Sequence, residues 1–261
     1  MIFGSLARSR TMMQAGERDP ACLLIQQLGI NQASDIDLES IAQSVGVQVR
    51  VGFLESCEAR LIGFRDRAII TVARNSDRRR RRFSIAHELG HWHHHRGRMT
   101  LCEVLDPSVT ATRADPVERE ADHYAANLLM PSHLFGASVQ RRAHRTLGVI
   151  SALSHEYRTS RIATMLRVIE LNLWPCMMIV QDAQGRIWSR RSSSFLIKEP
   201  LKRALPHKVL TMSAKTQQVE RPKHTAASDW FVGDASSSVR LTEQCCRAFG
   251  SAVLTLLVTC A

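Results

Sequence analysis

The chain has 261 residues, which is enough for one large domain or for two modest domains with separate cores. Its composition, 44% hydrophobic and 23% charged residues, is that of an ordinary globular protein and excludes an intrinsically disordered chain. The formal net charge of +11 is compatible with binding to phosphate groups. Arginine-rich solvated surfaces give the same balance, so charge alone does not identify a nucleic-acid-binding protein.

The sequence contains no uninterrupted apolar run of the length, about 18 residues, that a membrane-spanning helix needs. The apolar segment 251–261 is shorter than this and predicts a closing strand or a buried helix. Residues 1–13 lack the apolar core and the small-residue cleavage site of a signal peptide. The 7 cysteines are odd in number and include no Cys-x-x-Cys pair, which indicates free thiols in a reducing compartment. We therefore expect a cytoplasmic protein that does not contact a membrane.

The N-terminal part of the chain predicts two helices. Segment 17–30 has apolar residues at helical spacing, and segment 34–47 repeats this pattern after Ser34 or Asp35, either of which can serve as a cap. The apolar stripe of the second helix consists of Leu38, Ile41, Ala42 and Val45.

Three strands are expected next. Segment 47–53 alternates apolar and polar residues as a strand does, and segment 59–74 predicts a hairpin that turns near Arg65 and Asp66. Asn75, Ser76 or Asp77 can then cap a helix that begins in the arginine run.

Beyond this helix, Glu118–Met130 has the pattern of a second strong helix, with Pro116 near its start and Pro131 at its end. The character of the sequence changes after Pro131, and we place a domain boundary between residues 131 and 146.

The C-terminal half predicts two short helices in 147–173 and a hairpin in 176–193 that turns at Ala183–Gly185. Segment 213–229 is polar and is expected to be a loop. Segment 243–258 is expected to be a helix, or a helix that runs into a strand.

The stretch RRRRRFSIAHELGHWHHHRGR, residues 78–98, carries the main chemical signal. It could be a basic nucleic-acid patch, a chance cluster of histidines, or the metal-binding helix of a hydrolase. On a helix, His87 and His91 project from one face and can bind the same metal ion. Glu88 lies one step round the helix, where it can act as a base on water at the metal without being a ligand. Gly90 is expected to remove bulk beside the metal.

A catalytic zinc site needs a third protein ligand, because its fourth position is kept for water. Glu118 and Asp122 are four residues apart and share a face of the second helix. One carboxylate can bind zinc, while the other can accept the outer N–H of a ligand histidine and fix its tautomer. A solvated acidic face is the competing interpretation. The apolar residues of the same helix argue against it: Ala121, Ala125, Leu128 and Leu129.

The residues around the motif receive less specific interpretations. For the histidines at 93–95, a second metal or a proton relay is conceivable, but we favour solvated side chains or side chains that support the ligands. The Arg78–Arg82 run places positive charge at a helix N-terminus, where the helix dipole disfavours it. Such a run packs by its aliphatic stems or binds an acidic partner more often than it contacts DNA.

The segment RRFSIAHELGH, followed by EREADHYAANLLMP, resembles the ImmA/IrrE family of zinc metallopeptidases. The match is tight over residues 80–131 and looser from about residue 20. The resemblance implies that His87, His91 and Glu118 are the ligands of one zinc ion per chain and that Glu88 is the general base. The chain departs from the family pattern at Asp122, usually Asn, and at Tyr124, usually Phe. Asp122 would strengthen a histidine contact but could reduce the Lewis acidity of the metal.

The resemblance also implies an α+β fold: a zincin-like metallopeptidase domain with a small curled sheet and the two ligand-bearing helices, over residues 1–135. Residues 136–261 would hold a helix-turn-helix-like segment and a mixed α/β region with a sensory or partner-binding role. The substrate implied by the resemblance is a protein, a transcriptional repressor of the helix-turn-helix class. The residue that would stabilise the oxyanion is left open between Tyr124 and the histidines at 93–95.

Three functional hypotheses remain at this point. The first is a cytoplasmic zinc peptidase, and the second is a non-catalytic regulator that binds DNA or a partner and has a structural or vestigial zinc site. The third is a sensor whose C-terminal region binds a small ligand and gates the peptidase, which is compatible with the first. Glu88 favours the first hypothesis over the second, because a structural zinc site needs no base. Any DNA binding is expected to be weak and without sequence preference.

Overall fold

The computed structural model describes residues 19–55, 57–95, 115–182, 184–202, 219–233, 239–248 and 252–259. The prediction about a signal peptide in residues 1–13 lies outside this part of the chain. No helix within it is long and apolar enough to cross a membrane.

The described residues form a mixed α+β structure in two compact units. The N-terminal unit comprises residues 19–138 and 154–163, and the C-terminal unit comprises residues 139–153 and 164–259. The assignment of 1–135 and 136–261 as functional domains stays a prediction.

The N-terminal unit begins with short capped helices. Helix α2 (Pro20–Gln27) has Asp19 as its N-cap and proline at its first position. A 3-10 turn, η1 (Ala33–Asp35), then leads to α3 (Leu38–Ser44). The cap of α3 is Asp37, which accepts from the Ser40 backbone N–H, so the prediction of Ser34 or Asp35 as the cap is wrong. Those two residues are already folded into η1, and Asp37 directly precedes the apolar stripe.

A three-stranded sheet follows, made of β1 (Val47–Gly52), β2 (Ala59–Phe64) and β3 (Arg67–Ala73) in the order β1-β3-β2. Strands β2 and β3 form the predicted hairpin, and Arg65 occupies its turn with φ 56°. Strands β1 and β3 pair in parallel, a connection that local patterns do not reveal.

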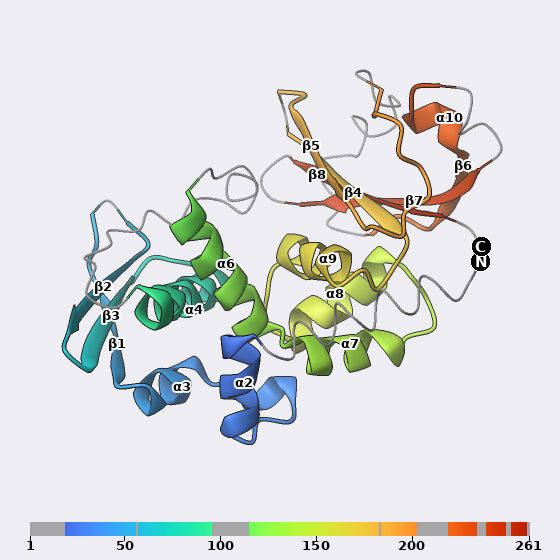
Figure 1. The fold of residues 1–261 in the computed structure, drawn as a ribbon. Coiled ribbons are helices and arrows are strands. Elements are labelled where there is room, and N and C mark those ends of the chain that lie inside the picture. Colours follow the sequence, from blue (N-terminus) through green and yellow to red (C-terminus); the bar gives the residue numbers. More distant parts are fainter. Residues whose placement is uncertain are drawn as a thin grey trace. The chain divides into compact units, whose positions relative to one another are not determined.

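Two long helices complete the frame of the site (Figure 1). Helix α4 (Arg78–His94) is capped by Asp77, one of the three residues predicted for this role, and α6 (Pro116–Leu129) is capped by Asp115. Helix α4 packs against β2 and β3 and also against α6, and α6 in turn packs against α2. Helix α4 is therefore covered from several directions, which explains why every residue from Ser84 through Trp92 is buried.

Three shorter helices come next: α7 (Ser132–Gln140), α8 (Leu147–Glu156) and α9 (Arg161–Glu170). The last two confirm the prediction of two helices in 147–173. Each of the three helices contributes residues to both units.

The C-terminal unit contains a five-stranded antiparallel sheet in the order β5-β4-β8-β7-β6. Its elements are β4 (Cys176–Gln181), β5 (Ile187–Arg191), β6 (Lys223–Ala226), the short helix α10 (Ala227–Trp230), β7 (Arg240–Arg247) and β8 (Val253–Thr259). Trp230, Phe231 and Phe195 are among the largest side chains of its hydrophobic core.

Two predictions for this unit are wrong. The helix expected in 243–258 is wrong, because residues 240–247 form strand β7; residues 253–259 form strand β8, which agrees with the closing strand that was one of the two alternatives for 251–261. Strand β8 is buried on both faces and so lacks the alternation that would identify a strand. Segment 223–229, expected as part of a loop, forms β6 and the start of α10, while 213–218 lies outside the described residues. The hairpin in 176–193 is confirmed by the pairing of β4 with β5.

Candidate metal centre

Helices α4 and α6 bring three ligand-type side chains together inside the N-terminal unit. Suitable ligand atoms of His87, His91 and Glu118 all lie within 4.8 Å of one another. Both imidazoles are buried, and the Glu118 carboxylate is partly exposed at the first turn of α6, where the helix dipole favours a negative charge. These are the three residues that the sequence analysis named as zinc ligands.

The separations between these atoms fit a tetrahedral metal ion. The two Nε2 atoms of His87 and His91 are 3.1 Å apart, and each lies 3.4 Å from one oxygen of Glu118. Zinc bonds to nitrogen or oxygen of about 2.0–2.1 Å, at tetrahedral angles, require ligand atoms about 3.3 Å apart. The residues present therefore fit a zinc ion in donor type, number and spacing.

Asp122 contacts the ring nitrogen of His87 that points away from the other two candidate ligands. Its Oδ1 lies 2.9 Å from Nδ1 of His87, so that the ring can donate Nδ1–H to the carboxylate. This tautomer leaves the Nε2 lone pair directed toward the other two ligands. The structure thus places Asp122 next to His87. Glu118, in contrast, lies close to both histidines.

The charges of this group stabilise one another. Burial would lower the pKa of His87, but hydrogen bonds to Asp122 and Glu118 outweigh burial and raise that pKa to about 9. Hydrogen bonds from His87 and His91 hold the pKa of Glu118 far below its usual value. In the absence of a metal, these acids therefore favour the protonated form of His87.

Glu88 is fully buried next to the ligands, and within the described chain neither of its carboxylate oxygens has a hydrogen-bond partner. Burial raises its pKa to about 7, against the opposing effect of His87. A buried carboxylate without a partner costs folding free energy, so its presence points to a chemical role. A base with a pKa near neutrality suits proton transfer at physiological pH.

The close approach of the two helices depends on Gly90. A Cβ atom at this position would lie 2.9 Å from the Ala121 Cα and 3.1 Å from the Tyr124 Cβ. The sequence analysis placed the missing bulk beside the metal, but the structure places it against the backbone of α6. Gly90 thus allows α6 to carry Glu118 up to the histidines.

Sequence reasoning missed two further links between these helices. Nε2 of His95 lies 3.2 Å from an oxygen of Glu120, and the ring of His93 stacks on Tyr124 at 5.4 Å between centroids. Both pairs depend on how α4 and α6 cross, for which the sequence carried no signal beyond the small residues Gly90 and Ala121. Burial raises the pKa of Tyr124 to about 12. A role for Tyr124 or for the histidines at 93–95 at the oxyanion stays a prediction.

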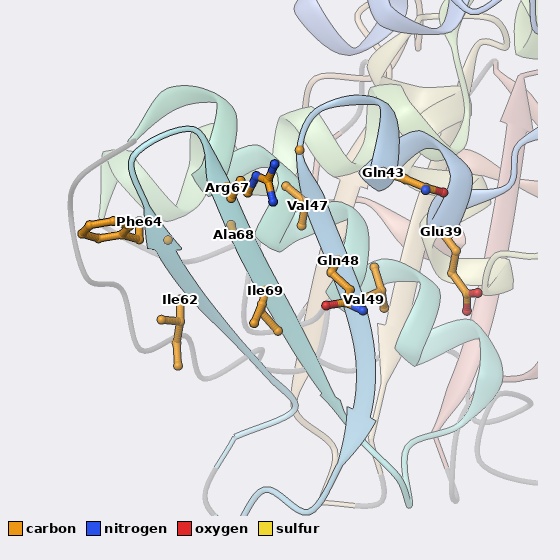
Figure 2. A pocket seen from close by; sticks show the side chains of 12 residues that line it. Glu39, Gln43, Val47, Gln48, Val49, Ile62, Phe64, Arg67, Ala68 and Ile69 are labelled. Carbon is orange, nitrogen blue, oxygen red and sulfur yellow. The ribbon is translucent and has the colours of Figure 1, made fainter.

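A hollow of about 820 Å³ lies elsewhere in the same unit, over the three-stranded sheet (Figure 2). Its lining comes from α3 and the three strands and does not include His87, His91 or Glu118, the candidate metal ligands. Gly63 faces Trp92 of α4, so its neighbours Ile62 and Phe64 point to the opposite side of the sheet and are exposed. This hollow offers no histidine or cysteine, and we assign the chemistry to the trio instead.

Comparisons with known proteins agree with this assignment. The family model of the IrrE N-terminal-like domain, Peptidase M78, matches residues 42–168, which include His87, Glu88, His91 and Glu118. A solved structure described as a Mycobacterium tuberculosis transcriptional regulator superposes with a TM-score of 0.61 at 15% identity, over 97% of this chain and 90% of that chain. At this identity the likeness concerns the fold alone. No curated protein matches the sequence.

Proposed function

Since residues 42–168 belong to the IrrE N-terminal-like domain family of peptidases, we propose that the chain is a zinc-dependent endopeptidase that cleaves a specific protein partner. The observation that carries the proposal is the trio of His87, His91 and Glu118 at tetrahedral separations, with the buried base Glu88 beside it.

A zinc ion held by the trio would supply Lewis acidity, polarising the scissile carbonyl and making a water molecule more acidic. Glu88 takes the proton of that water at its carboxylate and later delivers it to the leaving amine. Asp122 keeps His87 in the tautomer and orientation that a ligand needs. Burial of His87, His91 and Glu88 keeps competing bulk water away from the reacting groups.

The alternative is a regulator whose zinc is structural or vestigial. A structural zinc site is normally closed by four protein ligands. In the described part of the chain the cluster has three members. A zinc ion bound here would leave its fourth position for water, and Glu88 is placed to act as the base, which favours the catalytic interpretation.

We propose further that the substrate is a transcriptional repressor of the helix-turn-helix class. Support for this comes from the family resemblance; the solved structure of similar fold is described as a transcriptional regulator, and that description names no substrate. Generic peptides are expected to be poor substrates, because recognition would come from a docked partner.

The test is to incubate the protein with a candidate repressor of the helix-turn-helix class, first of all any that is encoded beside its gene, and to follow the size of the repressor on a gel. Glu88→Gln keeps the shape of the side chain but removes its basicity, so cleavage should fall by several orders of magnitude while zinc is retained. Undiminished cleavage by Glu88→Gln would show that the chemistry lies elsewhere.

A further inference from the structure

Basic side chains from two separate segments meet at the start of helix α4. This arginine cluster consists of Arg78, Arg79 and Arg82 in the first two turns of α4, and His155 and Arg158 at and after the end of α8. Nη2 of Arg79 lies 3.5 Å from Nδ1 of His155, which joins the two segments directly.

The short turn η1 holds two members of the arginine cluster together. Arg82 donates to the carbonyl of Ile36 at 3.2 Å, and Arg158 donates to the carbonyl of Ser34 at 3.4 Å. Each guanidinium has five N–H donors, so these bonds leave most of them for a ligand. Among the described residues the buried Nε of Arg82 has no hydrogen-bond partner.

The charges of the arginine cluster oppose one another. Arg78 and Arg79 lie at the positive end of the α4 dipole, and Arg78 and Arg82 form a like-charge pair four residues apart. Burial, and then the charge of Arg158, lower the pKa of Arg82 to about 10, and Asp37 only partly offsets them. A bound anion would relieve all of these repulsions together.

The acidic groups nearby are already engaged. Asp37 accepts from the Ser40 hydroxyl, Asp35 accepts from the Ser34 hydroxyl, and Asp77 accepts from the Arg79 backbone N–H at the helix cap. These fixed carboxylates among the arginines would repel a nucleic-acid backbone, whose negative charge is continuous. A short peptide can instead place single carboxylates at the guanidinium groups, whose planar fork matches them.

The position of the arginine cluster relates it to the candidate metal centre. Arg79 precedes His87 by eight residues on α4, a rise of about 12 Å along the helix. An extended peptide covers this distance with about four residues. A substrate with its scissile bond at the metal could therefore bring nearby acidic side chains to the arginines.

We propose that the arginine cluster is a docking site for an acidic segment of the protein substrate. The inference rests on the proposed peptidase function, and it names a feature of the substrate, glutamate or aspartate residues a few positions from the cleaved bond.

The test measures binding without cleavage, using the full chain with Glu88→Gln and a fluorescein-labelled octapeptide of alternating glutamate and serine. Adding Arg79→Gln alone should weaken binding at least about fivefold at low salt, and adding Arg158→Gln as well should weaken it at least about tenfold. The matched control for Arg79→Gln is Arg80→Gln. It removes one positive charge from the same arginine run, but Arg80 is outside the arginine cluster and lies 4.0 Å from Glu58. This control should change affinity less than about twofold.

A second pair of substitutions guards against a folding defect in the glutamine variants. Arg79→Glu with Arg158→Glu should lose the acidic octapeptide and gain binding of its lysine–serine counterpart. Equal weakening by Arg80→Gln, no binding of the acidic peptide, or tighter binding of a labelled DNA duplex at the same residues would each overturn the proposal. None of these readouts requires cleavage, so failure of the docking site leaves the peptidase proposal standing, and the reverse also holds.

Discussion

At His87 the two ring nitrogens have separate tasks. Nδ1 donates to Asp122 and Nε2 faces Glu118, so the orientation of the ring is fixed from both sides. Carboxylates in the position of Asp122 typically contribute ten- to a hundredfold in metal affinity. We expect Asp122→Ala to weaken zinc binding by about this factor, as measured by competition with a chromogenic chelator. Asp122→Asn keeps an acceptor oxygen, so its zinc affinity should lie between those of the wild type and Asp122→Ala. Equal affinity in all three proteins would rule out this role.

The second residue-scale prediction concerns Glu88 in metal-free protein. Burial raises its pKa from 4.5 to about 7, so the folded state binds this proton more tightly than the unfolded state. Ionisation of Glu88 therefore costs stability, and the cost grows between about pH 4.5 and pH 7. At pH 8 it is of the order of 3 kcal/mol, from about 1.4 kcal/mol per unit of pKa.

Glu88→Gln should remove this cost. Chemical denaturation of chelator-treated protein should show the variant to be more stable than the wild type at pH 8, with a much smaller difference at pH 5. The stabilisation from His87, whose raised pKa of about 9 makes it fade at alkaline pH, is present in both proteins and largely cancels. The same difference at both pH values would contradict the assignment of Glu88 as a buried, unpartnered acid.

The sequence allowed the residues of the site to be predicted because their spacing is local. Positions 87 and 91, and positions 118 and 122, each share a helix face whatever the tertiary structure is. The structure brings all four side chains together, while their roles in catalysis stay predictions. The contacts of His95 with Glu120 and of His93 with Tyr124 could not be predicted, because they require the crossing of two helices that are distant in the chain.

At the scale of elements, the contact between α4 and α6 decides whether the third ligand reaches the histidines. Gly90→Ala would force a Cβ to within 3.0 Å of the Ala121 carbonyl oxygen, so the helices would have to separate. We expect a loss of about 1–3 kcal/mol in unfolding free energy. Zinc affinity should fall as well, because Glu118 moves with α6.

The matched control for this prediction is Gly148→Ala in α8. There a Cβ would meet only the Thr146 hydroxyl oxygen at 3.6 Å, so alanine should be neutral or stabilising by up to about 1 kcal/mol. Thermal melts and chelator competition on both variants are the measurements. A Gly90→Ala protein as stable and as zinc-avid as Gly148→Ala would show that the helix contact is not tight.

Helices and strands, like the site residues, could be predicted where local sequence patterns determine them, and not where contacts between distant segments determine them. Hairpin β2–β3 and the Asp77 cap were predictable from alternation and capping residues. Strand β8 was predicted only as one alternative to a helix, because it lies between β4 and β7 with both faces buried, and its largely apolar sequence suits either element. The parallel pairing of β1 with β3 is likewise set by packing on α3 and α4 and not by any local pattern.

At the scale of the whole molecule, each unit has its own core, and the cysteines among the described residues are distributed between the two units without forming disulfides. Cys176 and Cys245 of the C-terminal unit are buried, and burial raises the pKa of each to about 12. At pH 8 only about one in ten thousand of such thiols is ionised. Cys57 in the N-terminal unit is partly exposed.

Iodoacetamide at pH 8 should therefore modify Cys57 in the native protein, and should modify Cys176 and Cys245 only after denaturation, because the thiolate is the reactive form. Mass spectrometry of the digested protein gives the extent of labelling at each site. Labelling of all three cysteines at equal rates in the native state would contradict the buried cores described for the C-terminal unit.

The central claim, that His87, His91 and Glu118 hold a catalytic zinc ion, is tested most directly by the metal content of the purified protein. Elemental analysis should find about one zinc per chain in the wild type and in Glu88→Gln, since Glu88 is a base and not a ligand. His91→Ala removes one of three ligands and should lose most of the metal during dialysis. Equal zinc in the wild type and in His91→Ala would contradict the account.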